Sequence, residues 1–368
     1  MNQQDKNFWK YVLKHLQWLF LNKQVWKITL PLYLVIVIIW SQVYYTQETI
    51  IKINSLESIM IQQAKDFNLI LRDVMGDYSE VMPKNPTFLN KAVDISHLSA
   101  RQNLNWMFRY LVNHKPEVRD ALERFHFYEQ AIIDSLNKYE IPLDLRFVFL
   151  AESWAYPLAV STAGAAGGWQ FMPYTAVELK AELNEDVDMR RDPWYMSTVL
   201  CNYMSYLRQR AKSYDEATRA YNTGINRFLA AAANQSWVTK TWFVDVNDEN
   251  NIYLFWILAW SWIYEEPLKF GIKVNFDFPP MQIQTLKVRI DSRYYKDDLT
   301  FREIALVVKC DMFLLKDLNL SFLKLNKKGE RIIPGSKHQR YIIRLLKLPD
   351  GLEISHLKNL KIKGVEFL

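Results

Sequence analysis

The sequence predicts a mainly α-helical protein with one membrane-spanning helix near its start and a small α/β module at its end. Three observations predict this architecture. An uncharged apolar stretch at 28–45 follows a basic flank, apolar residues recur at three- and four-residue steps between about 99 and 270, and alternating segments follow only after residue 280. The first is typical of a membrane span, the second of helices and the third of strands.

Composition narrows the class of protein. Half of the 368 residues are apolar and 14% are aromatic, which permits a well-filled core and argues against disorder. Cys201 and Cys310 are too few for a disulfide framework, and the six histidines are scattered without metal-ligand spacing. The chain also lacks a phosphate-loop or dinucleotide fingerprint. We therefore expect neither a metal nor a cofactor.

The net charge of +6 is concentrated at the start of the chain. Residues 1–27 contain five lysines against one aspartate, a net +4, so the remaining residues carry only +2. A nucleic-acid binder would instead show a basic face on its folded domain. This distribution excludes nucleic acid as an expected partner and is typical of a cytoplasmic flank, which we assign to 1–27.

The stretch 28–45 is predicted to be a transmembrane signal anchor. Its 18 uncharged residues approach the lower limit for a spanning helix, and Trp26, Trp40, Tyr44 and Tyr45 flank it as an aromatic belt would. A cleaved signal peptide is the alternative, but no small-residue cleavage site follows the apolar run. The bulk of the chain then lies outside the cytoplasm.

Residues 46–98 are predicted to form a juxtamembrane helix and linker. Apolar residues at helical spacing run from Ile50 to Met75, and Pro83 and Pro86 then interrupt the pattern.

A helical domain is predicted over 99–270. Asp192-Pro193 opens one of its helices, and Asp215 is expected to cap a short helix that ends near Gly224. The apolar run 252–264 is too short to span a membrane and is predicted to be a buried helix; a second span would return the C-terminal region to the cytoplasm. Side chains expected to share helix faces are Trp106, Tyr110 and Leu111; Tyr128, Ile132, Leu136 and Tyr139; and Tyr195, Val199, Tyr203, Tyr206 and Leu207.

A small α/β module is predicted over 271–368. Residues 285–290 and 340–346 alternate as strands do, whereas 301–308 and 313–318 have the pattern of short helices.

One carboxylate is set within an apolar run of the helical domain. Glu152 follows 145–150 (LRFVFL) and precedes Trp154, and a Gly-rich segment comes next. An apolar environment disfavours the ionised form and raises a carboxyl pKa, as a general acid requires. An ordinary capping or salt-bridged glutamate fits the run alone equally well.

Three motifs downstream carry a resemblance to a known family. Glu152-Ser153 is followed by 159–165 (AVSTAGA), then by 167–173 (GGWQFMP), and later by 220–224 (AYNTG). These motifs, in this order, resemble the lytic transglycosylases of the lysozyme-like soluble-lytic-transglycosylase family. Residues 139–145 (YEIPLDL) and 188–193 (DMRRDP) resemble the branch of membrane-bound lytic murein transglycosylase D. The resemblance covers about residues 100–270 and implies a lysozyme-like catalytic domain.

The resemblance implies a role for each matching residue. Glu152 would be the single catalytic acid/base, and Ser161, Gln170, Tyr221 and Asn222 would line the substrate cleft. Alternatives remain from the residues themselves: Gln170 could bond the backbone of the Gly-rich loop, Tyr221 could be core packing, and Asn222 could cap a helix. The aromatic residues Trp154, Tyr156, Trp169 and Tyr174 could stack on sugars or belong to the core.

The family chemistry implies a peptidoglycan enzyme that consumes no water. The acid would protonate the β-1,4 bridge between N-acetylmuramic acid and N-acetylglucosamine, and the muramoyl 6-hydroxyl would close a 1,6-anhydro ring. The absence of an obvious second carboxylate favours this route over hydrolysis. The expected setting is the bacterial inner membrane with the catalytic domain in the periplasm. A hydrolytic muramidase and a catalytically weak wall-binding scaffold are the alternatives, and no protein partner is indicated.

The chain departs from the family at two positions. Gly168 replaces the usual Leu and predicts a looser turn, and Met189 replaces the usual acid in a segment that we interpret as scaffolding. The C-terminal module resembles a single degenerate LysM repeat in its strand–helix–helix–strand order, with 301–305 (FREIA) and 318–320 (LNL) as the suggestive residues. Glycan binding and a purely structural role remain equally open for it.

Overall fold

The computed structural model describes residues 77–276 except 237 and 239, together with 63, 283–290, 299–334, 341–346 and 365–367. The chain divides into two compact units, Met1–Asn68 and Leu69–Leu368, and all described residues but one lie in the second. The predicted cytoplasmic flank, the signal anchor at 28–45 and most of the juxtamembrane segment lie outside the described residues.

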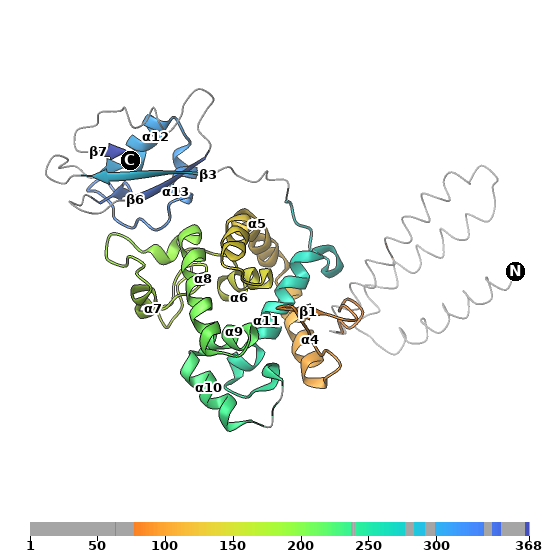
Figure 1. Ribbon diagram of the computed structural model, residues 1–368. Coiled ribbons are helices and arrows are strands. Elements are labelled where there is room, and N and C mark those ends of the chain that lie inside the picture. The colour runs from red at the N-terminus through yellow and green to blue at the C-terminus, as the bar shows by residue number, and fades with distance from the viewer. Residues whose placement is uncertain are drawn as a thin grey trace, which may run out of the picture. The chain divides into compact units, whose positions relative to one another are not determined.

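Helices dominate the described chain, as the sequence predicts (Figure 1). The short helix that carries Glu152 is α6, and it packs against α5 and α11. The helical elements are α4 (Leu98–Asn113), α5 (Lys115–Lys138), η2 (Leu143–Phe147), α6 (Val148–Ser153), α7 (Pro173–Glu178), η3 (Met189–Arg191), α8 (Pro193–Arg210), α9 (Tyr214–Thr223), α10 (Ile225–Asn234), η4 (Thr241–Phe243), α11 (Asp248–Glu265) and η5 (Pro267–Phe270).

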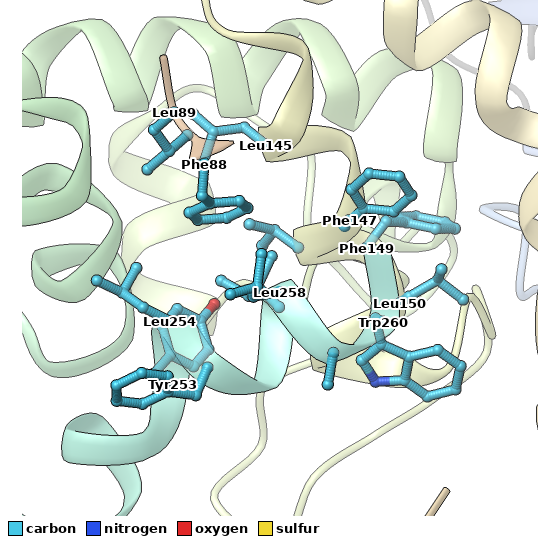
Figure 2. Packing of buried hydrophobic residues seen from close by; sticks show 14 of the residues in the cluster. Phe88, Leu89, Leu145, Phe147, Phe149, Leu150, Tyr253, Leu254, Leu258 and Trp260 are labelled. Carbon is cyan, nitrogen blue, oxygen red and sulfur yellow. The ribbon is translucent and has the colours of Figure 1, made fainter. Parts of the chain in front are cut away.

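The helix α11 is the central core element. Its residues Leu254, Leu258 and Trp260 pack in one cluster with Phe147 and Phe149 of the η2–α6 segment (Figure 2). This confirms the buried helix predicted for the apolar run 252–264. Within the part of the chain that the structure describes, no helix is both long and apolar enough to cross a membrane.

The core of the helical domain extends upstream of the predicted boundary at residue 99. Tyr78, Phe88 and Val93 are buried in the same cluster as the helices. Phe88 lies in a short antiparallel hairpin of β1 (Thr87–Phe88) and β2 (Lys91–Ala92), and Val93 follows it directly. Pro83 and Pro86, which predicted a linker, therefore lie in a segment whose apolar side chains pack into the core of the helical domain.

Two helix faces differ from the sequence prediction. Trp106 and Tyr110 do share a face, with rings 5.8 Å apart, but both are exposed, and only Leu111 of the predicted three is buried, beside Leu104 and Met107. In α8 the predicted residues Val199 and Leu207 are buried, together with Met196, Leu200 and Met204, whereas Tyr206 is exposed. Aromatic side chains mislead here because their size gives them weight in a periodic pattern regardless of burial.

The predicted cap of α9 is wrong. Ser213 is the N-cap, and its hydroxyl accepts a hydrogen bond from the Glu216 backbone N–H. Asp215 is buried inside the first turn and forms an ion pair with Lys91 of the hairpin at 2.8 Å. Ser and Asp are both good caps, so spacing alone could not separate them.

The C-terminal module has the predicted element order with additions. The strands β3 (Ile283–Ile290) and β6 (Tyr341–Leu346) pair antiparallel, and α12 (Phe301–Val308) and α13 (Met312–Asp317) lie between them in sequence. The strand β7 (Val365–Phe367) adds to the other edge of β3, and β4 (Leu299–Thr300) pairs with β5 (Ile332–Ile333). The two strands and two helices predicted for the module are thus present, although the LysM resemblance gains no support beyond this order.

Candidate active site

The backbone at the end of α6 fixes the position of Glu152. Trp154 and Ala155 both adopt left-handed conformations, so the chain turns sharply just after the helix. The Ser153 hydroxyl donates to the Gly168 carbonyl at 2.8 Å, which joins the helix end to the Gly-rich loop, residues 159–173. The Trp256 indole N–H donates to the Ala151 carbonyl at 3.0 Å and holds the same turn against α11.

Glu152 is a partly buried acid with a raised pKa. Burial is the main cause and raises the pKa to about 7, a hydrogen bond from the Tyr253 hydroxyl opposes the shift, and the charge of Glu249 adds to it. A carboxyl group with this pKa is partly protonated at neutral pH, so it can both donate and accept a proton. The raised pKa predicted from the apolar run is thereby confirmed.

Tyr253 is a site residue that the sequence reasoning missed. Its side chain is 5% exposed, and burial together with the nearby Glu152 holds its pKa well above the usual range. It therefore remains a neutral hydroxyl donor to the Glu152 carboxyl. It lies in the apolar run of α11. The one signal in the sequence was that a tyrosine hydroxyl in a buried helix needs a hydrogen-bond partner.

A second carboxylate, Glu249, also lies within electrostatic range of Glu152. It is exposed in the first turn of α11, four residues before Tyr253. The Asn222 side-chain amide donates to Glu249 Oε1 at 2.9 Å. The sequence showed no obvious second carboxylate beside Glu152, whereas the structure places Glu249 near enough to raise its pKa.

The Gly-rich loop is tightly packed and not loose. A side chain at Gly168 would place its Cβ 1.9 Å from the Phe149 ring, and one at Gly167 would lie 1.8 Å from the Arg190 carbonyl oxygen. The looser turn predicted at Gly168 is wrong, because the Phe149 ring fills the space that a larger residue would take.

Ser161 and Gln170 both brace this loop. The Ser161 hydroxyl accepts from the Ala165 N–H at 3.0 Å. The Gln170 amide donates to the carbonyl oxygens of Gly167 at 2.7 Å and Ala159 at 3.3 Å. For Gln170 the loop-bracing alternative is thus observed, and both side chains remain partly exposed.

Tyr221 and Asn222 come from the last turn of α9. The Tyr221 hydroxyl donates to the Trp169 carbonyl, and the charge of Glu152 contributes to raising the Tyr221 pKa, so the two groups lie close enough to interact. Asn222 is not the helix cap, a position that Gly224 fills with φ 85°. Its side-chain oxygen Oδ1 accepts a hydrogen bond from the side-chain amide of the buried Asn250 at 2.8 Å. Glu152 thus lies in α6, Ser161 and Gln170 in the Gly-rich loop, and Tyr221 and Asn222 in α9, which the Tyr221–Trp169 hydrogen bond joins to the loop.

The four candidate stacking aromatics differ in exposure. Trp169 is fully buried and is core. Trp154 is half-buried and packs edge-on against Trp260. Only Tyr156 and Tyr174 expose large parts of their rings. Among the residues that the structure describes, no group of three or more His, Cys, Asp or Glu side chains could hold a metal ion.

A helical domain that keeps one glutamic acid near neutral pKa, beside a packed Gly-rich loop, has the construction of a general acid–base enzyme. Comparison with known proteins specifies the class further. Residues 130–243, less than half of the chain, match the Transglycosylase SLT domain, so the chain is similar to that family over this range. The matched range contains Glu152, Ser161, Gln170, Tyr221 and Asn222 but ends before Tyr253 and before the C-terminal module.

Two curated relatives are membrane-bound lytic murein transglycosylase D from Escherichia coli strains K12 and O6:H1. Each is 28% identical over 173 residues, which cover 45% of this chain and 37% of the relative. The chain thus matches well under half the length of these relatives. A solved structure of an inactive mutant of lytic transglycosylase Slt from Pseudomonas aeruginosa is 19% identical with a TM-score of 0.30, and the match covers 38% of this chain and 24% of that one.

Proposed function

We propose that the protein is a peptidoglycan lytic transglycosylase that uses Glu152 as its only acid/base. It would cleave the β-1,4 bond between N-acetylmuramic acid and N-acetylglucosamine and leave 1,6-anhydromuramic ends. The observation that carries the proposal is the partly buried Glu152 carboxyl, which accepts a hydrogen bond from the buried Tyr253 and lies in the range that matches the Transglycosylase SLT domain.

The first step needs the protonated acid. Glu152 transfers its proton to the bridging oxygen as the bond to the muramoyl anomeric carbon breaks, and N-acetylglucosamine leaves with a free 4-hydroxyl. The substrate's own N-acetyl group supports the developing cation. The Tyr253 hydroxyl donates to the carboxylate that forms, so the negative charge is not left unpaired in a partly buried site.

The second step returns the proton. The carboxylate accepts the proton of the muramoyl 6-hydroxyl, whose oxygen closes on the anomeric carbon as a 1,6-anhydro ring. Glu152 is then protonated again and no water has been consumed. A pKa near the operating pH suits both steps, because a stronger or weaker acid would favour one transfer at the expense of the other.

Ser161, Gln170, Tyr221 and Asn222 are proposed to shape and line the sugar-binding cleft. The hydrogen bonds described above fix the loop and the end of α9 beside Glu152, which supports a pre-formed cleft. Glycan strands would be the substrate and partner.

Glu249 favours a second candidate, a hydrolytic muramidase. A carboxylate near the acid could activate a water molecule as general base, as in two-carboxylate glycosidases. Its exposure and its hydrogen bond from Asn222 are compatible with such a role. In the preferred reaction Glu249 serves only to raise the Glu152 pKa.

The test is digestion of purified peptidoglycan by the full chain and its Glu152→Gln variant, followed by mass analysis of the released muropeptides. Products lighter by one water than hydrolytic ones, absent with the variant, are expected. Ordinary reducing ends that disappear in Glu249→Gln would establish the muramidase. Wall binding without release by the wild type would establish a scaffold.

Anchorage at the bacterial inner membrane, with the catalytic domain in the periplasm, is part of the proposal. The apolar stretch 28–45 and its basic flank support it. Glycan binding by the C-terminal module also remains a proposal, supported by the element order β3–α12–α13–β6.

A further inference from the structure

The segment 183–192 of the helical domain also belongs to the C-terminal module. Val187 is fully buried and is a member of the module's hydrophobic cluster, together with Phe322 and Ile343. Met189 packs against both this cluster and the core of the helical domain. Met189, one of the two residues that depart from the family pattern, therefore contacts both cores.

Backbone hydrogen bonds also join the segment 183–192 to the C-terminal module. The Asp188 N–H donates to the Ser321 carbonyl at 2.8 Å, and the Leu323 N–H donates to the Asp186 carbonyl at 2.8 Å. Val187 and Phe322 form an antiparallel bridge. The module thus pairs with the segment as a neighbouring strand would.

A buried ion pair completes the contact. Arg344 of β6 is 5% exposed and binds the carboxylate of Asp192, which is 3% exposed and caps α8. The Asn319 side chain, also buried, accepts from the Arg344 N–H and donates to its carbonyl, both at 2.9 Å. The Arg344 guanidinium also lies 5.1 Å from the centre of the Trp194 ring.

The same segment reaches the Gly-rich loop through Arg190. The Asp188 carboxylate holds the Arg190 guanidinium with hydrogen bonds of 2.9 and 3.0 Å. Arg190 Nη1 donates in turn to the carbonyl oxygens of Gly164 at 2.8 Å and Phe171 at 3.2 Å. One guanidinium thereby joins the two arms of the loop that contains Ser161 and Gln170.

We propose that the C-terminal module is a positioning element for the Gly-rich loop: Arg344 and residues 321–323 hold 186–192 in place, and Arg190 transmits this restraint to Gly164 and Phe171. The restraint concerns the conformation of the loop itself. Only its consequence for turnover rests on the proposed function.

The physical basis is the way each buried charge is paired. Asp188 and Asp192 flank Arg190 in sequence, and each depends on a guanidinium, one from the domain and one from the module. Removal of Arg344 leaves the Asp192 carboxylate desolvated without its ion-pair partner, so the segment must move toward water to regain solvation. Arg190 and the loop carbonyls move with it.

Hydrogen exchange with mass spectrometry on the full chain tests this proposal. In Arg344→Met, amide exchange over 161–171 is expected to accelerate about tenfold, while α4 and α9 keep their protection. Arg344→Lys retains the charge and is expected to restore part of the protection. The matched control is Arg302→Met, which removes an exposed ion pair with Glu330 in the same module and is expected to leave the loop unchanged.

A second variant covers the case in which Arg344→Met unfolds the module. Arg190→Met cuts the link to the loop, whereas Arg191 still pairs with Asp188 at 3.4 Å, so exchange is expected to accelerate in 161–171 while the module stays protected. The double variant should add little to the larger single effect, because both residues act through one path. Unchanged loop exchange in Arg190→Met, or fully additive effects, would overturn the proposal.

Steady-state kinetics distinguish a displaced loop, which lowers turnover, from a changed Glu152 pKa, which shifts the pH profile. Arg344→Met is expected to lower turnover on peptidoglycan several-fold without shifting the pH dependence, because the hydrogen bond from Tyr253 to Glu152 and the nearby charge of Glu249 remain. The exchange result stands even if the protein has a different substrate. A shifted pH profile with normal loop protection would contradict positioning through the loop.

Discussion

At Glu152, three neighbouring influences set the proton affinity: burial raises the pKa, the Tyr253 hydrogen bond lowers it, and Glu249 raises it. Replacing Tyr253 by Phe removes the contribution that favours the carboxylate, so the pKa should rise further. Activity requires the protonated acid and falls as pH increases through this pKa. We expect that fall to move to higher pH by up to about one unit in Tyr253→Phe, measured as kcat/KM against pH. Movement to lower pH would mean that the tyrosine favours the neutral acid.

The same pKa makes Glu152 a stability cost. Its folded pKa of about 7 exceeds the unfolded value of about 4.5, so its contribution is fully favourable below pH 4.5 and is lost as pH rises through 7. Glu152→Gln should therefore stabilise the fold by up to about 3 kcal/mol at pH 8 and by almost nothing at pH 4. Denaturant unfolding at the two pH values measures this. An equal effect at both would contradict a desolvated carboxylate.

At the scale of elements, the contact between α6 and the Gly-rich loop depends on Gly168. A Cβ there would lie 1.9 Å from the Phe149 ring, which is itself buried. Gly168→Ala should destabilise the fold by about 2 kcal/mol or more. Gly164→Ala is the control, because its Cβ meets no atom within 4 Å and only its positive φ costs about 1 kcal/mol. Thermal melting of both variants gives the comparison, and equal costs would argue against the ring contact.

The elements also indicate how far sequence reasoning could reach. The helix α12 has the predicted bounds, and α11 was predicted as a buried helix, because a strong period or a long apolar run leaves few alternatives. Tyr253 was missed for the same reason: in a run that is apolar on every side, no pattern distinguishes a functional hydroxyl from core. The Gly-rich loop was found by its motifs, but its packing depends on Phe149 and Arg190, which approach it only in the folded chain.

The contacts between the helical domain and the C-terminal module were the least predictable feature of the structure. The module was predicted as a domain over 271–368 with no stated contact to the helical domain, and Val187 and Asp192 of the helical domain contact it directly. These contacts join residues more than 130 positions apart in sequence, as for Val187 with Phe322, so no local pattern encodes them. Asp192 was predicted only as the start of a helix, a role that it also fills.

Anchorage is tested on the whole chain. The stretch 28–45 is expected to retain the protein in the membrane pellet after extraction at high pH. Deletion of 28–45 should release it to the supernatant, because the apolar residues of α11 are buried in the core. Replacing 28–45 with another apolar span of similar length is the control that should restore retention. Retention without any span would contradict a single N-terminal anchor.

The central claim is that Glu152 catalyses ring closure and not the addition of water. Digestion of peptidoglycan in ¹⁸O-labelled water measures this directly at each new muramoyl end. The proposed chemistry predicts products with anhydro mass that carry no label, because the 6-hydroxyl of the substrate supplies the oxygen. One ¹⁸O at each new reducing end would contradict it and would assign water activation to a second group such as Glu249.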